Sequence, residues 1–147
     1  MKKELFVILG NHKTGKSITI RGLTSMFRKG KCIIETDNGN IDIYVLISAL
    51  QEAGLAIDKA VEVLGEHERL LIPLHISGGS IYPGALEYIQ AFRNAGFTVS
   101  QLVALGNNQD AVGNIQKAFP QTMSIDTFKD MPNNHAASQI REAWGWR

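Results

Sequence analysis

The sequence has 147 residues, of which 44% are hydrophobic and 20% are charged. This length suits one domain and is too short for two ordinary ones. The 15 basic and 14 acidic residues nearly balance, and a net charge of +1 excludes the strongly basic signature of non-specific DNA binding. A single cysteine excludes an internal disulfide, and no apolar run approaches the roughly 20 residues of a membrane span, so we expect a soluble, cytoplasmic protein.

The first elements of the chain are predicted to be a strand, a helix and a second strand. Residues 5–9 form a continuous apolar run that ends at a glycine, which is typical of a strand buried on both faces. A helix is expected over about 16–28, although β-branched residues and an interior glycine favour it only weakly. The strand over 32–36 is closed by a turn over 37–40.

The middle of the chain is harder to interpret. Residues 41–53 fit either a strand or a helix, and their length favours a helix from about Tyr44. Apolar residues at helical spacing follow over 57–67. A buried strand is then expected over 70–76, leading into the loop Gly78-Gly79-Ser80.

The rest of the chain alternates helices with strands. The predicted elements are a helix that stops at Gly96, a strand over 97–105, a helix to about Phe119, a short strand over 123–125 and a last helix to Trp144. Strands that alternate with helices of this length predict an α/β fold, with a mostly parallel sheet and right-handed crossovers. We therefore expect a three-layer sandwich of the P-loop type, with helices on both faces and one domain over residues 1–147.

The loop after the first strand matches the pattern G-x-x-x-x-G-K-[ST] at every fixed position. Gly10 and Gly15 allow the backbone N–H groups to approach phosphate oxygens. Lys16 would reach the β- and γ-phosphates, and Ser17 would offer its hydroxyl to magnesium at the positive end of a helix. The sequence thus predicts a site for ATP and Mg²⁺ built from Gly10, Asn11, His12, Lys13, Thr14, Gly15, Lys16, Ser17 and Ile18. The lack of an N/T-K-x-D guanine-reading motif favours ATP over GTP.

The second strand and its turn, Cys32-Ile33-Ile34-Glu35-Thr36-Asp37-Asn38-Gly39-Asn40, resemble a segment of the ParA/MinD-type ATPases. In that family an apolar strand ends in D-x-D-P-Q-G-N, which Asp37, Gly39 and Asn40 fit, whereas Glu35 replaces the first aspartate. Residues 71–74 and 102–108 resemble two later segments, the second of which leads to an asparagine that contacts the base. The chain is similar to a reduced ParA/MinD-like ATPase, with a deviant Walker A loop, of the plasmid stability or transfer type.

Two departures from the family pattern affect what the resemblance implies. Asn11 stands where the family has an extra lysine that reaches the nucleotide of a dimer partner. No run of four apolar residues ending in aspartate lies between Asn40 and Leu70, where the magnesium-site strand is expected. The acid of the magnesium site is therefore not identified by the sequence, and slow or absent hydrolysis is expected.

The resemblance implies roles for two further residues. Asp37 would orient the attacking water or bind magnesium through water, because a carboxylate at the carboxyl end of a strand would face the phosphates. Its other interpretation is that it only starts the turn, which aspartate does well. Asn107 would contact the adenine base, and its alternative role is also that of a turn former.

The predicted function is a nucleotide-dependent switch. In this interpretation a slow Mg²⁺-dependent ATPase changes its loops around Asp37 and Gly78 with the γ-phosphate. It would act in positioning or transfer of plasmid DNA, through a protein partner or a homodimer, with only indirect DNA contact. Two alternatives stay open: a small-molecule phosphotransferase, such as a nucleoside or nucleotide kinase, and a nucleotide-binding module without turnover. The arginines are never clustered into the lid that a phosphotransferase of this kind needs.

Overall fold

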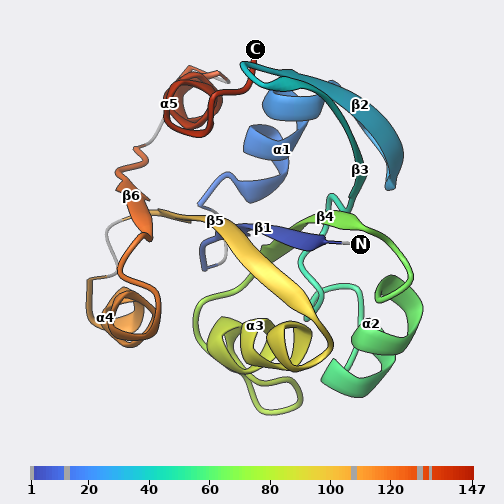
Figure 1. The fold of residues 1–147 in the computed structure, drawn as a ribbon. Coiled ribbons are helices and arrows are strands. Elements are labelled where there is room, and N and C mark those ends of the chain that lie inside the picture. Colours follow the sequence, from blue (N-terminus) through green and yellow to red (C-terminus); the bar gives the residue numbers. More distant parts are fainter. Residues whose placement is uncertain (1, 12–13, 107–108, 129–130, 133) are drawn as a thin grey trace.

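The computed structural model describes residues 2–11, 14–106, 109–128, 131–132 and 134–147, and over these ranges the chain forms six strands and five helices (Figure 1). In chain order they are β1 (Lys3–Leu9), α1 (Lys16–Thr24), β2 (Gly30–Thr36), β3 (Gly39–Val45), α2 (Ile57–Leu64), β4 (Arg69–Leu74), α3 (Ala85–Asn94), β5 (Phe97–Leu105), α4 (Gln109–Ala118), β6 (Met123–Ile125) and α5 (His135–Trp144).

All six strands belong to one mixed sheet in the order β2-β3-β4-β1-β5-β6. The hairpin of β2 and β3 is antiparallel, and every other neighbouring pair is parallel. β1 lies between β4 and β5, the central place that a continuous apolar strand predicts. The predicted α/β class with a mostly parallel sheet is therefore confirmed.

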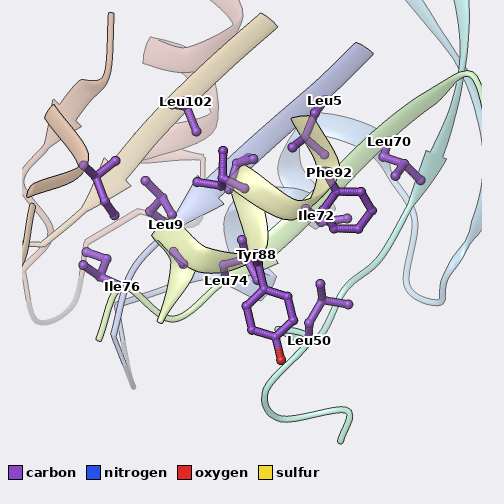
Figure 2. Close-up of a cluster of buried hydrophobic side chains, with 14 of the residues drawn as sticks. Leu5, Leu9, Leu50, Leu70, Ile72, Leu74, Ile76, Tyr88, Phe92 and Leu102 are labelled. Atoms are coloured by element: carbon purple, nitrogen blue, oxygen red, sulfur yellow. The ribbon is translucent and has the colours of Figure 1, made fainter. Parts of the chain in front are cut away.

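Helices cover both faces of this sheet and enclose two apolar cores. α2, α3 and α4 pack on one face, whereas α1 and α5 pack together on the other (Figure 1). β1 contributes to both cores, because Leu5, Val7 and Leu9 face the first and Phe6 and Ile8 face the second. Figure 2 shows Tyr88 and Phe92 of α3 among the leucine and isoleucine side chains of the first core. This arrangement is that of a three-layer sandwich.

Two elements differ from the sequence prediction. The favoured helix from about Tyr44 is wrong, because residues 39–45 form β3, which pairs in register with β2 so that Cys32 lies opposite Ile43. The partner strand thus decided between two interpretations that local pattern left open. α1 ends at Thr24 rather than near Arg28, because Ser25 takes a left-handed conformation with φ of 59°.

The last residues of the chain pack on the α1/α5 face near β1. Trp144 and Trp146 lie against Phe6, with ring centroids at 5.7 and 5.4 Å. Trp146 also bridges to Thr36 of β2, and the backbone N–H of Arg147 donates to the carbonyl of Glu35. In the ranges that the structure describes, no helix has both the length and the apolar character needed to cross a membrane.

Candidate functional site

The connections that follow the two central strands lie on opposite faces of the sheet, which makes a crevice at the carboxyl ends of these strands. β1 continues into α1 on one face of the sheet, whereas its parallel neighbour β4 continues toward α3 on the other face. In open parallel sheets such a switch point is where ligands bind. The backbone N–H of Gly10 donates to the carbonyl of Leu74 at 3.1 Å, so the loop after β1 starts against the end of β4.

The loop over residues 10–17, called here the glycine-rich loop, has a shape that Gly10 and Gly15 make possible. An added Cβ at Gly10 would lie 2.1 Å from the hydroxyl oxygen of Thr14, so only glycine fits there. Gly15 has φ of 88°, a left-handed conformation that turns the chain directly into α1. The hydroxyl of Thr14 donates to the carbonyl of Asn11 at 2.8 Å and closes the loop on itself. These residues form the compact turn that the motif predicts.

Lys16 is the central charge of the site. It is the first residue of α1, is only 6% exposed, and donates from Nζ to the carbonyl of Asn11 at 3.0 Å. Burial lowers the pKa of Lys16, and the nearby carboxylate of Glu52 partly offsets this effect. A lysine buried this far usually has a strong anionic partner, and the position suits a phosphate chain above the loop.

Ser17 is the residue that fits a nucleotide-bound magnesium ion. Its half-buried hydroxyl lies in the first turn of α1 and donates to the carbonyl of Ile47 at 3.1 Å. Magnesium prefers oxygen ligands and keeps several waters and phosphate oxygens, so it needs few protein ligands. Among the described residues no group of three or more His, Cys, Asp or Glu side chains could hold a metal ion.

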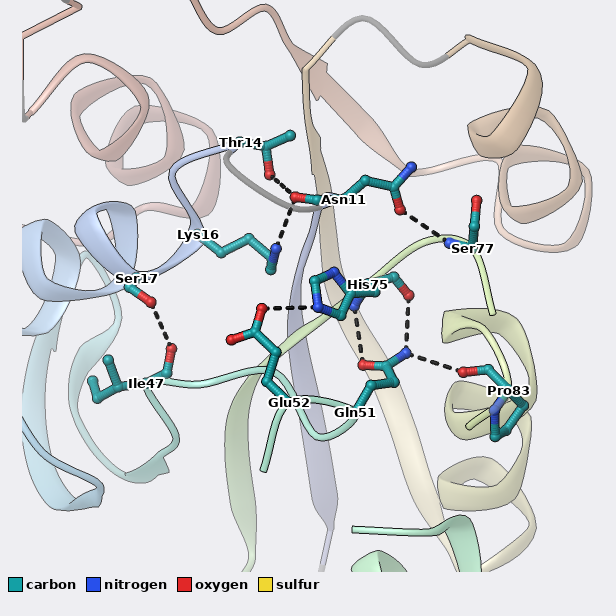
Figure 3. A network of polar contacts seen from close by, with 10 residues as sticks. All are labelled: Asn11, Thr14, Lys16, Ser17, Ile47, Gln51, Glu52, His75, Ser77 and Pro83. Atoms are coloured by element: carbon teal, nitrogen blue, oxygen red, sulfur yellow. Dashed lines mark hydrogen bonds and ion pairs between the residues drawn. The ribbon is translucent and has the colours of Figure 1, made fainter. Parts of the chain in front are cut away.

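A histidine and a carboxylate that the sequence analysis missed border the same crevice. The Nε2 atom of His75, directly after β4, lies 2.8 Å from Oε1 of Glu52, in the segment after β3 (Figure 3). Burial and the ammonium group of Lys16 lower the pKa of His75, and the Glu52 carboxylate and the Gly10 backbone act in the opposite direction. Figure 3 shows the Lys16 side chain directed toward both residues.

One hydrogen bond and one close approach hold the glycine-rich loop against its neighbouring loops. The backbone N–H of Ser77 donates to the side-chain oxygen of Asn11 at 3.2 Å. At the end of β5, an added Cβ at Gly106 would lie 3.1 Å from the methyl group of Thr14. The loop is thus held between the carboxyl ends of β4 and β5.

Several predicted site residues are brought together, and others are not. Gly10, Asn11, Thr14, Gly15, Lys16 and Ser17 form one continuous site, and Ile18 follows on α1 with 42% of its surface exposed. His12, Lys13 and Asn107 lie outside the described residues.

Asp37 lies at the opposite edge of the sheet from the crevice. It begins the turn before β3, at the amino end of that strand, whereas the glycine-rich loop follows the carboxyl end of β1. Because β3 and β1 run in the same direction, these two ends are at opposite edges of the sheet. Its backbone N–H donates to the carbonyl of Gly145, and its carboxylate pairs with Arg147 at 3.2 Å. The structure therefore gives no support to a catalytic or magnesium role of Asp37, and favours the turn interpretation.

One signal in the sequence could have indicated His75. It lies near the carboxyl end of the buried strand predicted over 70–76, and the carboxyl ends of parallel strands gather at one edge of a sheet. Glu52 offered no such signal, because the strand before it was not recognised. Comparison with known proteins adds no assignment: no protein-family model and no curated protein matches this chain.

Proposed function

We propose that this protein binds ATP with Mg²⁺ at the glycine-rich loop and acts as a nucleotide-dependent switch. The observation that carries the proposal is the burial of Lys16 at the switch point of the sheet. Its ammonium group donates to a loop carbonyl, and the Glu52 carboxylate is nearby. Among the described residues the ammonium group makes no ion pair. A phosphate chain would give this buried charge a strong partner, and α1 would add its helix dipole.

The switch is proposed to act through the two bonds that hold the neighbouring segments. Ser17 now donates to Ile47, and Asn11 accepts from Ser77. A Ser17 hydroxyl that turned to bind magnesium would release the Ile47 carbonyl, and phosphate above the loop would compete with the Asn11 oxygen for the N–H of Ser77. The responsive segments would then be residues 46–52 and 77–84, which make different contacts with and without the γ-phosphate. Residues 77–84 include Gly78, which the sequence analysis also names, and residues 46–52 take the place of the turn at Asp37 in this proposal.

The cellular role rests on the resemblance to ParA/MinD-type ATPases. That resemblance supports a slow ATPase that positions or transfers plasmid DNA through a protein partner or a homodimer. The net charge of +1 favours indirect contact with DNA. This cellular role depends on nucleotide binding, which can be measured directly.

Calorimetric titration with ATP and Mg²⁺ tests the site directly. We expect micromolar binding by the wild-type protein, with weaker binding of GTP. Removing one partner of a buried charge pair costs about 2–5 kcal/mol, so Lys16→Ala should bind at least about 30-fold more weakly. Lys31→Ala removes the same charge from an exposed position on β2 and should leave the affinity unchanged. Wild-type protein that does not bind ATP would refute the proposal.

Hydrogen exchange tests the switch as distinct from binding. Residues 46–52 and 77–84 should change their exchange when the non-hydrolysable ATP analogue and Mg²⁺ are added, and ADP should give a smaller change. The Lys16→Ala protein should show neither. Tight binding with identical exchange at both segments would leave a nucleotide-binding module and eliminate the switch.

A small-molecule phosphotransferase is the second candidate function. The observation that favours it is a cavity of about 320 Å³ beside the glycine-rich loop, which Glu52 and His75 line. A cavity of this size accommodates a small acceptor. Transfer of labelled phosphate from ATP to an acceptor would distinguish this function from the switch.

A further inference from the structure

The cavity beside the glycine-rich loop, called here the side cavity, has a polar wall and a loop wall. The polar wall comes from the segment after β3 and the residue directly after β4, and the loop wall comes from the segment before α3. Gln51, Glu52 and His75 line the polar wall, and residues 77–82 line the loop wall. Because the N–H of Ser77 donates to Asn11, the side cavity adjoins the place where a γ-phosphate would lie.

Glu52 is the charged group of the side cavity that a ligand can reach. Its side chain is 43% exposed, whereas that of His75 is 17% exposed. One carboxylate oxygen is engaged by His75 at 2.8 Å, and Figure 3 shows the other directed away from the imidazole. Since burial and Lys16 lower the pKa of His75, the imidazole is favoured in its neutral form. A neutral imidazole with its proton on Nε2 donates to the nearer carboxylate oxygen of Glu52.

The position of Glu52 is fixed by the residue before it. The Gln51 side-chain oxygen accepts from the backbone N–H of His75 at 3.1 Å. The Gln51 amide donates to the carbonyls of His75 and Pro83 at 3.1 and 3.2 Å. Gln51 therefore joins the segment after β3 to β4 and to the loop before α3. Groups held by such a network are preorganised for chemistry.

We propose that the side cavity is the subsite of a hydroxyl nucleophile, either water or an alcohol, and that Glu52 is its general base. This inference rests on the proposed function, because it needs ATP on the glycine-rich loop. The nucleophile would lie between Glu52 and the γ-phosphate, with Lys16 stabilising charge on the phosphoryl group.

The step balances without any further reactant. The nucleophile oxygen forms a bond to the γ-phosphorus as its proton passes to Glu52. The bond from the γ-phosphorus to the bridging oxygen breaks, and its electron pair leaves on the β-phosphate of ADP. Water gives inorganic phosphate and an alcohol gives a phosphate ester. Glu52 then returns its proton to solvent.

Substitution of Glu52 by an isosteric amide tests the base. Loss of a general base costs about 100- to 10,000-fold in rate, so Glu52→Gln should lower γ-phosphate release at least about 100-fold. Calorimetry should still show binding of ATP and Mg²⁺ by this variant, which separates the base from the binding site. Glu62→Gln removes a carboxylate that is 73% exposed on α2 and should behave like wild type.

The outcomes separate this inference from the proposed function. Wild-type protein that fails to bind ATP refutes both. Wild-type protein that binds ATP but releases no phosphate to water or alcohol, or a Glu52→Gln protein that turns over at the wild-type rate, refutes only the assignment of Glu52.

The two sources of the hydroxyl are distinguished by product analysis. ATP labelled at the γ-phosphate is incubated with protein alone and with excess glycerol as a probe alcohol. Labelled phosphate as the sole product assigns the subsite to water, and labelled glycerol phosphate assigns it to an alcohol. In either case Glu52→Gln should form the product at least about 100-fold more slowly, and a product formed at the wild-type rate overturns the proposal.

His75 is assigned as the positioning residue of Glu52. His75→Ala should lower kcat about tenfold while the KM for ATP is unchanged, because the base stays but loses its orientation. His75→Gln should recover part of kcat, since an amide N–H can still donate to the carboxylate. Equal kcat in both variants and wild type would remove His75 from the assignment, and a matched thermal melt shows that each variant is folded.

Discussion

Two regions of this protein place charged residues in opposite environments. At the crevice after β1, Lys16 is 6% exposed, bonds to a loop carbonyl and lies near the Glu52–His75 pair. At the C-terminal corner, defined here by Phe6, Asp37, Trp144, Trp146 and Arg147, the charged pair is exposed and the buried groups are aromatic. Asp37 and Arg147 lie 3.2 Å apart with each side chain 65% exposed.

The contrast separates a region that we propose is shaped by a ligand from one that is held together by packing. Burying an ammonium group costs free energy that a fold alone has no reason to incur. An exposed ion pair contributes little, so the stability of the C-terminal corner comes from its aromatic contacts. Disruption of the corner should therefore lower stability, whereas disruption of the crevice should lower nucleotide affinity.

The largest effect is expected from Trp146→Ala. The side chain is 6% exposed and packs on Phe6 and Trp144, with ring centroids at 5.4 and 5.0 Å. Replacement of a buried aromatic residue by alanine costs about 3–5 kcal/mol, which denaturant unfolding would measure. The folded fraction should still bind ATP with wild-type affinity. A loss of affinity at full folding would show that the two regions are coupled.

Gly10→Ala should give the reverse pattern at the crevice. An added Cβ would lie 2.1 Å from the Thr14 hydroxyl, and overpacking costs about 1–3 kcal/mol. If the loop bears this cost on binding, ATP affinity falls about 5- to 150-fold. Gly39→Ala is the matched control, because its φ of 109° strains any other residue while no atom lies within 4 Å. Its cost should appear in thermal stability, and a comparable loss of ATP affinity there would contradict the comparison.

The sequence predicted the fold better than it predicted the acid of the site. Continuous apolar runs identified β1 and β4, because a strand buried on both faces needs apolar residues at nearly every position. β3 was missed because the length of the segment over 41–53 favoured a helix from about Tyr44, and only pairing with β2 decided the outcome. Asp37 was named because of the resemblance to the ParA/MinD-type ATPases, and no local pattern pointed to Glu52. Local pattern specifies the glycine-rich loop, whereas the Glu52–His75 pair arises only when two strand ends meet.

Asp37→Asn is the smallest expected effect and the sharpest test of that lesson. An exposed ion pair contributes about 0–1 kcal/mol, so the variant should unfold at nearly the wild-type denaturant concentration. The small difference should disappear in high salt, because salt screens exposed charges. ATP affinity and phosphate release should be unchanged, since the carboxylate bonds to Arg147 at the edge of the sheet away from Lys16. A tenfold loss of either would restore Asp37 to the site and require the β2–β3 turn to move when nucleotide binds.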